Sequence, residues 1–332
     1  MGDVNVPDAV GAVVDREFPG SDVRAVEGYG GGCKETYRIT FDDRAVFVAF
    51  PREAWYERQF ALEPALMELV GRETTLPVPQ VLASDVSGTT TRPYHVTAAI
   101  DGADLRGRFG SLPRGTQAAL LEAAGRALAE LHREVRFEAS GPLHAADTER
   151  GVAVDSRPSW PAFLAELVGD WLVELGGSRF SDLAPTFERV LTPESFLSRE
   201  VEPVCLHFDY APGNLLARAD ELVGVVDWGF AVAGHAEYDL FEFEKNFLLA
   251  ELDDPARDEL RPHVHAGYRD VRDVEPGWEH RRAFYRVAYT LASMRSFHRW
   301  TGGRSERERD ELAARLRAEL ETDLDRLRAE EG

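Results

Sequence analysis

The sequence predicts an α+β protein with two lobes, one built around a small sheet and a larger one that is mostly helical. The chain has 332 residues, about twice the length of an average domain. Segments typical of strands lie mainly before residue 98, and apolar residues recur at helical spacing over most of the chain after residue 105. The predicted boundaries are therefore 1–98 for the first lobe, 99–104 for a connection and 105–332 for the second lobe.

The first lobe is predicted from short strands separated by turn residues. Its predicted elements are, in order, a helix at 9–18, strands at 23–27, 36–41 and 45–50, a helix at 54–70, a segment at 77–82 that leads into a fourth strand, and a fifth strand at 94–100.

A glycine-rich turn joins the first two predicted strands. Gly30, Gly31 and Gly32 precede Lys34, and the backbone amides of such a flap can approach phosphate groups closely. Clustered glycines also form plain flexible hairpins, which is the alternative interpretation.

The second lobe is predicted from long segments with an apolar stripe at helical spacing. The predicted helices lie at 116–133, 160–175, 282–300 and 305–330. Residues 137–159 are rich in turn formers and predict an inserted or exposed loop.

The composition is strongly acidic. Asp and Glu number 59 against 38 Lys and Arg, which gives a formal net charge of −21, and Lys34 and Lys245 are the only lysines. A charge this negative argues against nucleic acid or an anionic membrane as a partner. We interpret the acidity as an adaptation to high salt in a halophilic source, with an ordinary acidic protein as the alternative.

The remaining composition predicts a cytoplasmic protein. Cys33 and Cys205 give no disulfide framework. The first residues lack the basic and apolar regions of a signal peptide, and no apolar segment approaches the length of a membrane span.

The most informative stretch is residues 204–229, VCLHFDYAPGNLLARADELVGVVDWG. A short apolar run leads into a loop that contains Asp209, and two short strands follow, at 215–217 and 222–226. In such a hairpin the start of the first strand and the end of the second lie side by side. Asn214 and Asp227 should therefore face one another, with Asp209 on the adjacent loop.

These three side chains predict phosphoryl-transfer chemistry. Two carboxylates and an amide oxygen suit Mg²⁺, which prefers oxygen ligands and shares them with phosphates. We interpret Asn214 and Asp227 as the metal ligands and Asp209 as the group that accepts the proton of a substrate hydroxyl. An ordinary loop between two strands is the alternative, because Asp and Asn are common turn residues.

The pattern H-x-D-x-x-x-x-N, followed by an apolar strand that ends in D-x-G, resembles the catalytic core of the protein-kinase-like phosphotransferases. It is most similar to the aminoglycoside and choline kinase branch, whose loop carries a proline at the position of Pro212. The resemblance implies a two-lobed protein-kinase-like fold. A small antiparallel-sheet lobe binds the nucleotide, and a larger, mostly helical lobe carries the catalytic and substrate-binding residues.

The resemblance also implies roles for residues outside the catalytic loop. It implies ATP and Mg²⁺ as cofactors, adenine binding at the hinge by Ala98, Ala99 and Ile100, and a helix glutamate, for which Glu63 and Glu57 both lie on plausible faces. It further implies that His207 and Asp239 hold the catalytic loop in place.

The sequence departs from this family on the third strand. The usual lysine that bridges the nucleotide phosphates and the helix glutamate falls at Val48 or Ala49. Arg52, Lys34 or Arg38 could supply the positive charge instead.

The resemblance implies one function, and the missing lysine suggests an alternative. The first is a kinase that transfers the γ-phosphoryl group of ATP to a hydroxyl of a small molecule, such as an aminoglycoside, an amino alcohol or a sugar. The second is a nucleotide-binding pseudokinase or regulatory protein on the same fold. A protein kinase is less favoured, because the stretch between Gly229 and Asp239 is too short for an activation segment.

Glu237, Glu242 and Glu244 could receive amino groups of a substrate or could simply reflect the acidic composition.

Overall fold

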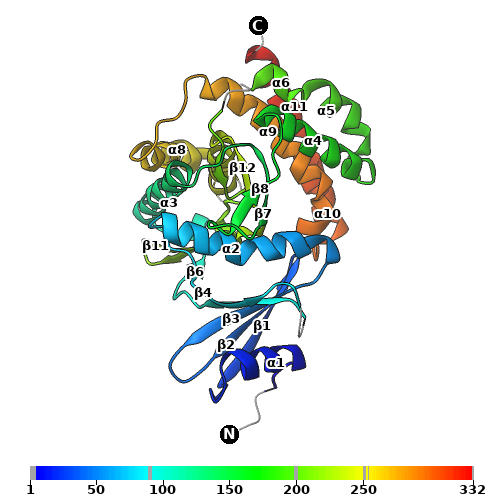
Figure 1. Ribbon diagram of the computed structural model, residues 1–332. Helices are drawn as coiled ribbons and strands as arrows, with labels where there is room; N and C mark the ends of the chain where they lie inside the picture. Colours follow the sequence, from blue (N-terminus) through cyan, green and yellow to red (C-terminus); the bar gives the residue numbers. More distant parts are fainter. Residues whose placement is uncertain (1–4, 89–91, 198–200, 250–251, 253, 331–332) are drawn as a thin grey trace.

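The computed structural model describes residues 5–88, 92–197, 201–249, 252 and 254–330. Figure 1 shows two lobes, with the sheet of the first below helix α2 and the helices of the second above it. The predicted α+β class with a sheet lobe and a helical lobe is therefore confirmed.

The first lobe is an antiparallel five-stranded sheet in the order β1-β2-β3-β5-β4. Its elements are α1 (Asp8–Glu17), β1 (Ala25–Gly31), β2 (Lys34–Thr40), β3 (Ala45–Pro51), the short helix η1 (Ala54–Tyr56), α2 (Glu57–Glu73), β4 (Val81–Asp85) and β5 (Tyr94–Ala98).

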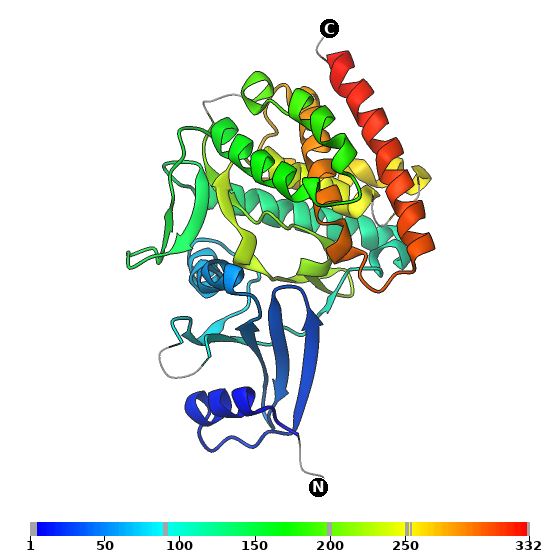
Figure 2. The same cartoon turned by 90° about the vertical axis from the view of Figure 1, so that its right-hand side faces the viewer.

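The two faces of this sheet are covered by different helices. Val10 and Val13 of α1 pack with Val46 and Val48 on one face. On the other face, Ala49 packs with Tyr56 and Phe60, which belong to η1 and α2. Figure 2 shows α2 between the sheet and the helical lobe, so residues that alternate along β3 face either α1 or the junction of the lobes.

The glycine flap differs from its prediction. Gly28 and Gly30 pair with Tyr37 and Glu35 within the ladder, so both strands extend further than expected. The turn itself is Gly32–Cys33, and Gly32 has a φ of +64°. The predicted turn over residues 28–34 was too long, because glycines weaken a strand without preventing its hydrogen bonds.

The second lobe consists of helices around two small sheets. Its helices are α3 (Arg114–Glu134), α4 (Trp160–Gly176), α5 (Ala184–Val190), α6 (Pro193–Phe196), α7 (Glu237–Glu244), α8 (Asp254–Arg269), α9 (Trp278–Arg295), α10 (Phe297–Trp300) and α11 (Glu306–Glu330). Its short helices are η2 (Phe109–Ser111), η3 (Ser181–Leu183), η4 (Pro212–Asn214), η5 (Trp228–Phe230) and the π-helix η6 (Lys245–Leu249). Its strands are β6 (Ala103–Asp104), β7 (Gly141–Ala145), β8 (Val152–Val154), β9 (Val204–Leu206), β10 (Leu215–Arg218), β11 (Glu221–Val225) and β12 (Val232–Gly234).

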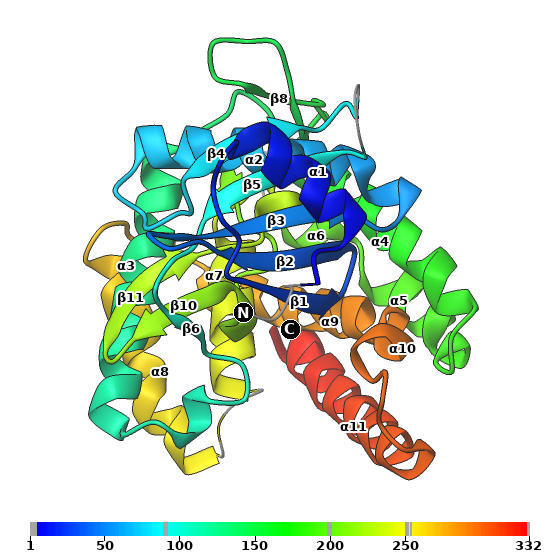
Figure 3. The same ribbon diagram turned by 90° about the horizontal axis from the view of Figure 1, so that it is seen from below.

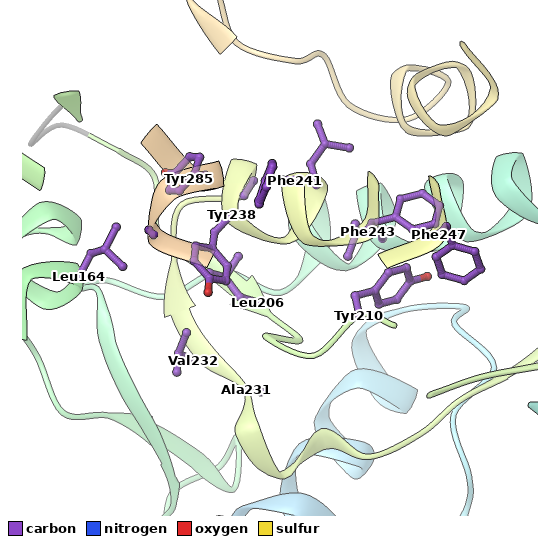
Figure 4. Packing of buried hydrophobic residues seen from close by; sticks show 14 of the residues in the cluster. Leu164, Leu206, Tyr210, Ala231, Val232, Tyr238, Phe241, Phe243, Phe247 and Tyr285 are labelled. Carbon is purple, nitrogen blue, oxygen red and sulfur yellow. The ribbon is translucent and has the colours of Figure 1, made fainter. Parts of the chain in front are cut away.

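Large aromatic side chains fill the centre of this lobe. The indole N–H of Trp160 donates to the Tyr285 hydroxyl at 3.1 Å, and Tyr238 lies edge-on to both rings. Figure 4 shows α7, with Tyr238, Phe241 and Phe243, lying alongside Tyr210 of the catalytic loop. Helix α7 therefore supports the loop from behind.

The segment at 137–159 is not the exposed loop that its turn formers predict. It forms β7 and β8, and β7 pairs with β12 in a four-stranded sheet of order β8-β7-β12-β9. The prediction was wrong because the partner strand β12 lies far along the chain, and strands this short carry little periodicity of their own. The helix expected at 282–300 also differs, because it begins at Trp278 and ends at Arg295, before the separate α10.

No helix in the described part of the chain is long and apolar enough to span a membrane.

Candidate active site

The hairpin β10–β11 brings together the two predicted metal ligands. Leu215 pairs with Val225, and the N–H of Val226 donates to the carbonyl of Asn214 at 2.9 Å. Asn214 and Asp227 therefore lie at the same open end of the hairpin, as the hairpin geometry predicts. Asp227 has a φ of +67°, a left-handed conformation that Asp tolerates better than most residues.

Asp209 lies directly beside this end of the hairpin. The Asn214 side-chain Nδ2 donates to the Asp209 carbonyl at 2.9 Å and to its Oδ2 at 2.8 Å. Burial raises the pKa of Asp209 to about 6, and the charge of Asp227 adds to this effect, whereas His207, Asn214 and Arg106 oppose it. At neutral pH the carboxylate is thus ionised, and its raised pKa makes it a better proton acceptor than an exposed Asp.

The remaining oxygens of the hairpin fit a divalent cation. Because Nδ2 of Asn214 is used twice by Asp209, the Oδ1 of Asn214 is the atom left to coordinate a metal. Asp227 offers a carboxylate that is one third exposed, with its Oδ1 bonded to Lys34. Amide and carboxylate oxygens are the ligand types that suit Mg²⁺.

The catalytic loop is held by Asp239. Its two oxygens accept the backbone N–H of His207 at 2.6 Å and of Phe208 at 3.0 Å. His207 donates its Nε2–H to the Val226 carbonyl at 3.0 Å, which connects the loop to the end of β11. Phe208 has a φ of +62°, so this turn is strained, and the two bonds to Asp239 hold it in that conformation.

Two further residues lie at this loop, one expected from the sequence to pack or to compensate the helix dipole and one not predicted at all. His132, at the end of α3, lies with its Nε2 3.4 Å from Asp239 Oδ2 and its Nδ1 2.9 Å from the Tyr268 hydroxyl. Arg106 places its guanidinium over Gly213, where a Cβ would lie 2.0 Å from Nη2. The sequence favours packing or compensation of the helix dipole over a catalytic role for His132, because it lies in the last turn of its helix. An exposed arginine gives no signal for Arg106.

Lys34 supplies the positive charge that β3 lacks. Its Nζ lies 2.7 and 2.8 Å from the two oxygens of Glu63 on α2, and 2.9 Å from Asp227 Oδ1. Burial by itself lowers the pKa of Lys34, but the charges of Glu63 and Asp227 outweigh it and raise the pKa well above its usual value. The lysine is therefore charged, and it connects the flap, α2 and the catalytic hairpin.

The geometry of the sheet explains why Lys34 can act from a different strand. Val48 is fully buried on the face that packs against α1, so no side chain at that position could reach Glu63. Ala49 lies on the face that packs with Tyr56 and Phe60, but its methyl group is too short and carries no charge. Lys34 begins β2 and pairs with Pro51, which places it at the flap end of the sheet, within hydrogen-bonding distance of Glu63 on α2. The other candidates bind elsewhere: Arg52 lies 3.9 Å from Glu35, and Arg38 donates to Thr40 at 3.0 Å.

The flap has open space where a ligand could approach. A Cβ placed on Gly30 or Gly32 would meet no atom within 4 Å. Packing therefore does not require glycine at these two positions, although the φ of Gly32 does.

The hinge offers one donor for a ligand. The N–H groups of Ala98 and Ala99 already donate to the carbonyls of Gln80 and Ala45, at 2.9 and 3.1 Å. Among the described residues, the N–H of Ile100 has no hydrogen-bond acceptor. Adenine binding by these residues stays a prediction, and Ile100 is the one of the three whose N–H is available for it.

This arrangement agrees with the comparison to a known family. The profile of the phosphotransferase enzyme family matches residues 25–284, well over half of the chain. The chain belongs to this family.

Solved structures of similar fold cover almost the whole phosphotransferase. A candidate fructosamine-3-kinase from Thermobifida fusca has a TM-score of 0.68 at 23% identity, over 98% of this chain and 99% of the other. The aminoglycoside phosphotransferase APH(2'')-IIa with gentamicin has a TM-score of 0.64 at 14% identity, over 98% and 96%. APH(2'')-Ib with ADP has a TM-score of 0.63 at 14% identity, over 97% and 99%. These likenesses confirm the predicted kinase-like fold, and no curated protein matches the sequence.

The acidic cluster after the hairpin is already engaged by the protein's own groups. Glu237 receives two hydrogen bonds from Arg281, at 2.6 and 2.5 Å. Glu244 forms ion pairs with Arg261 and Arg282. Glu242 accepts the N–H of Tyr210 at 3.0 Å. Of the two interpretations of this cluster, the contacts favour a structural role over a site for substrate amino groups.

Gly229 of the D-x-G motif lies where the two lobes pack closely against each other, next to Tyr56. A Cβ at this position would lie 2.2 Å from the Tyr56 hydroxyl, and Tyr56 is fully buried at the start of α2. Replacing Gly229 by alanine should therefore displace α2 and its Glu63. We expect a loss of about 1–3 kcal/mol in the free energy of unfolding, and a fall in turnover of about tenfold from the misplaced ion pair.

Chemical unfolding and ATP turnover measure these two effects. The control is Gly169→Ala, because Gly169 lies inside α4 with no atom within 4 Å of its added Cβ. That change should leave turnover unaltered and stabilise slightly. Wild-type turnover in Gly229→Ala would show that α2 tolerates the shift.

Proposed function

We propose that this phosphotransferase moves the γ-phosphoryl group of ATP to a hydroxyl group of a small molecule. The observation that carries the proposal is the Lys34–Glu63–Asp227 cluster beside Asp209. A positive charge for phosphates, oxygens for a metal ion and a proton acceptor are the parts that phosphoryl transfer requires. Here they lie within one site.

Each residue has a defined role in this proposal. Asn214 and Asp227 would hold Mg²⁺, which neutralises phosphate charge when bound. Lys34 would bind the nucleotide phosphates beneath the flap, and Ile100 would contact the adenine. Asp209 would take the proton of the acceptor hydroxyl. At the same time the hydroxyl oxygen would bond to the γ-phosphorus, and the bond between that phosphorus and the oxygen of the leaving ADP would break.

The alternative is a nucleotide-binding pseudokinase, and it rests on the absence of the lysine from β3. The contacts of Lys34 weaken this argument for a pseudokinase, because Lys34 pairs with Glu63 as a lysine on β3 would. Burial would raise the pKa of Glu63, but Lys34 and His95 lower it below its usual value. The two functions are separated by measuring binding and turnover independently.

The acceptor class is suggested by proteins of similar fold. One of them was solved with gentamicin, and another is described as a fructosamine-3-kinase. We therefore propose a polar hydroxyl compound of the aminoglycoside, amino alcohol or sugar type.

A thermal-shift titration with MgATP tests nucleotide binding, and ADP formation with a panel of these compounds tests transfer. Both belong in molar KCl, which screens the repulsion between ATP and an acidic protein. MgATP at a hundred times its Kd should stabilise the fold by about 2.7 kcal/mol, and ATP with EDTA should stabilise it less. Binding without ADP formation, even by slow hydrolysis, would favour the pseudokinase. The absence of both would exclude the proposed function.

A further inference from the structure

A cavity of about 450 Å³ lies in the helical lobe. Its walls come from α7, η6, α8, α9 and α11. Figure 3 shows α8 and α11 on opposite sides of the yellow segment that continues α7. The cavity therefore opens between elements that are distant in the sequence.

The charge of this cavity is opposite to that of the chain. The lining contains three acidic residues, Asp258, Glu319 and Asp323. It contains six basic residues: Lys245, Arg257, Arg261, Arg286, Arg315 and Arg326. In a protein with a net charge of −21, a wall with twice as many cations as anions is unlike the average surface. Such a wall attracts anions and repels cations.

Most of these arginines have carboxylate partners, whereas the lysine does not. Arg286 donates to Asp323 at 2.7 Å, and Arg315 donates to Glu319 at 2.9 Å. Among the described residues, no carboxylate lies within 4 Å of the Lys245 amine, whose Nζ lies 3.9 Å from the centre of the Tyr289 ring. Burial lowers the pKa of Lys245 to about 8, although Glu319 and Asp323 oppose the effect. The ammonium group is therefore partly desolvated and lacks a direct counterion.

The cavity is connected to the catalytic loop by single residues. Phe241 and Lys245 line it, and Glu242, from the same turn of helix, bonds to Tyr210, the neighbour of Asp209. Tyr289, under the Lys245 amine, lies within reach of the same charges: burial raises its pKa, and Glu242 and Asp209 add to this. Helix α7 and η6 thus contribute residues both to the cavity and to the support of the loop.

Glu242 follows the cavity-lining Phe241 in the sequence. Burial raises the pKa of Glu242 well above its usual value, with Asp239 and Asp209 acting in the same direction. Its neutral form is therefore more favoured than that of an exposed glutamate.

We propose that this cavity binds a small anion that carries a carboxylate or a phosphate group, and that Lys245 is the residue that contacts it. The inference does not depend on the proposed kinase function. The cavity favours anions over polycations such as aminoglycosides, because a polycation would meet the arginines of α8, α9 and α11. Lys245 would act in binding this anion.

Competitive labelling of lysine amines tests this inference on the unmodified protein. The chain has two lysines, so acylation by trace acetic anhydride, read by mass spectrometry of the two peptides, reports Lys245 against Lys34. The probes are inorganic phosphate, gluconate, glucose and kanamycin, each against KCl at equal ionic strength. Phosphate and gluconate should slow Lys245 acylation by about fivefold or more, as a directly paired ammonium requires. Glucose and kanamycin should have no effect.

A substitution at Lys245 tests whether the anion binds to this residue. In Lys245→Met, the thermal shift caused by phosphate should disappear, while it should persist in Arg218→Gln, whose exposed side chain lies on the β10–β11 hairpin. If KCl or kanamycin protects Lys245 as well as phosphate does, or if the phosphate shift survives in Lys245→Met, the inference is wrong. These outcomes leave the proposed function intact, because MgATP binding by the wild-type protein is measured separately and depends on Lys34.

Discussion

Replacing Lys34 by methionine should lower turnover by about 10²- to 10³-fold, the usual effect of removing one preorganised positive or hydrogen-bonding group from a transition-state site. The Lys34 amine contacts both oxygens of Glu63 and one oxygen of Asp227. Its loss removes the charge beneath the flap and leaves Glu63 buried, with His95 as its remaining close partner at 3.3 Å. Steady-state ADP formation with a saturating acceptor measures the effect.

Loss of a buried partner also destabilises the fold, so the two effects need separate controls. Lys34→Arg keeps the charge but not the compact geometry, and should recover part of the turnover. Arg38→Gln removes a cation from the same strand, where its guanidinium donates to Thr40, and should leave turnover near that of the wild type. If Lys34→Met retains full turnover while the protein remains folded, another cation must bind the phosphates.

The catalytic hairpin could be predicted from the sequence because its geometry is local. Asn214 and Asp227 belong to adjacent strands joined by a short turn, so the strand pattern alone brings them together. Asp239 is nearly as local, since it follows the next short strand.

The pairing of Lys34 with Glu63 was not determined by local pattern. It depends on the register between β2 and β3, on the length of the flap, and on the height of α2 above the sheet. The sequence could name Lys34 as one of three candidate cations, but only the packing of α2 selects among them. The same limit applies to the lining of the cationic cavity, whose residues come from helices that meet only in the folded lobe.

The acidic composition also has a structural consequence that the sequence alone did not reveal. Many of the acids in the helical lobe are paired with arginines, including Glu237 with Arg281 and Asp182 with Arg317. The exposed pair of Asp182 with Arg317 contributes little, about 0–1 kcal/mol. Glu237 is buried, so its pairing with Arg281 satisfies a carboxylate that would otherwise be costly inside the lobe.

Replacing Asp209 by asparagine should reduce transfer by about 10²- to 10⁴-fold, the range expected when a positioned proton acceptor is removed. Asparagine keeps an oxygen that can accept the hydrogen bond of Asn214, so the loop should keep its conformation. MgATP binding, which the proposal assigns to Lys34, Asn214 and Asp227, should remain close to that of the wild type. Full turnover in this variant would show that Asp209 is not the proton acceptor.

The same substitution should not destabilise the protein, and this distinguishes a catalytic carboxylate from a structural one. Burial raises the pKa of Asp209 from 3.8 to about 6, so the folded protein binds this proton more tightly than the unfolded chain does. The wild type should therefore lose stability relative to Asp209→Asn as the pH rises from about 4 to 6, and the difference should then stay constant. Unfolding midpoints measured across this range test the sign, with Asp220→Asn in the exposed hairpin turn as the control. A carboxylate retained for structure would give the opposite trend, because its ionised form would stabilise the fold.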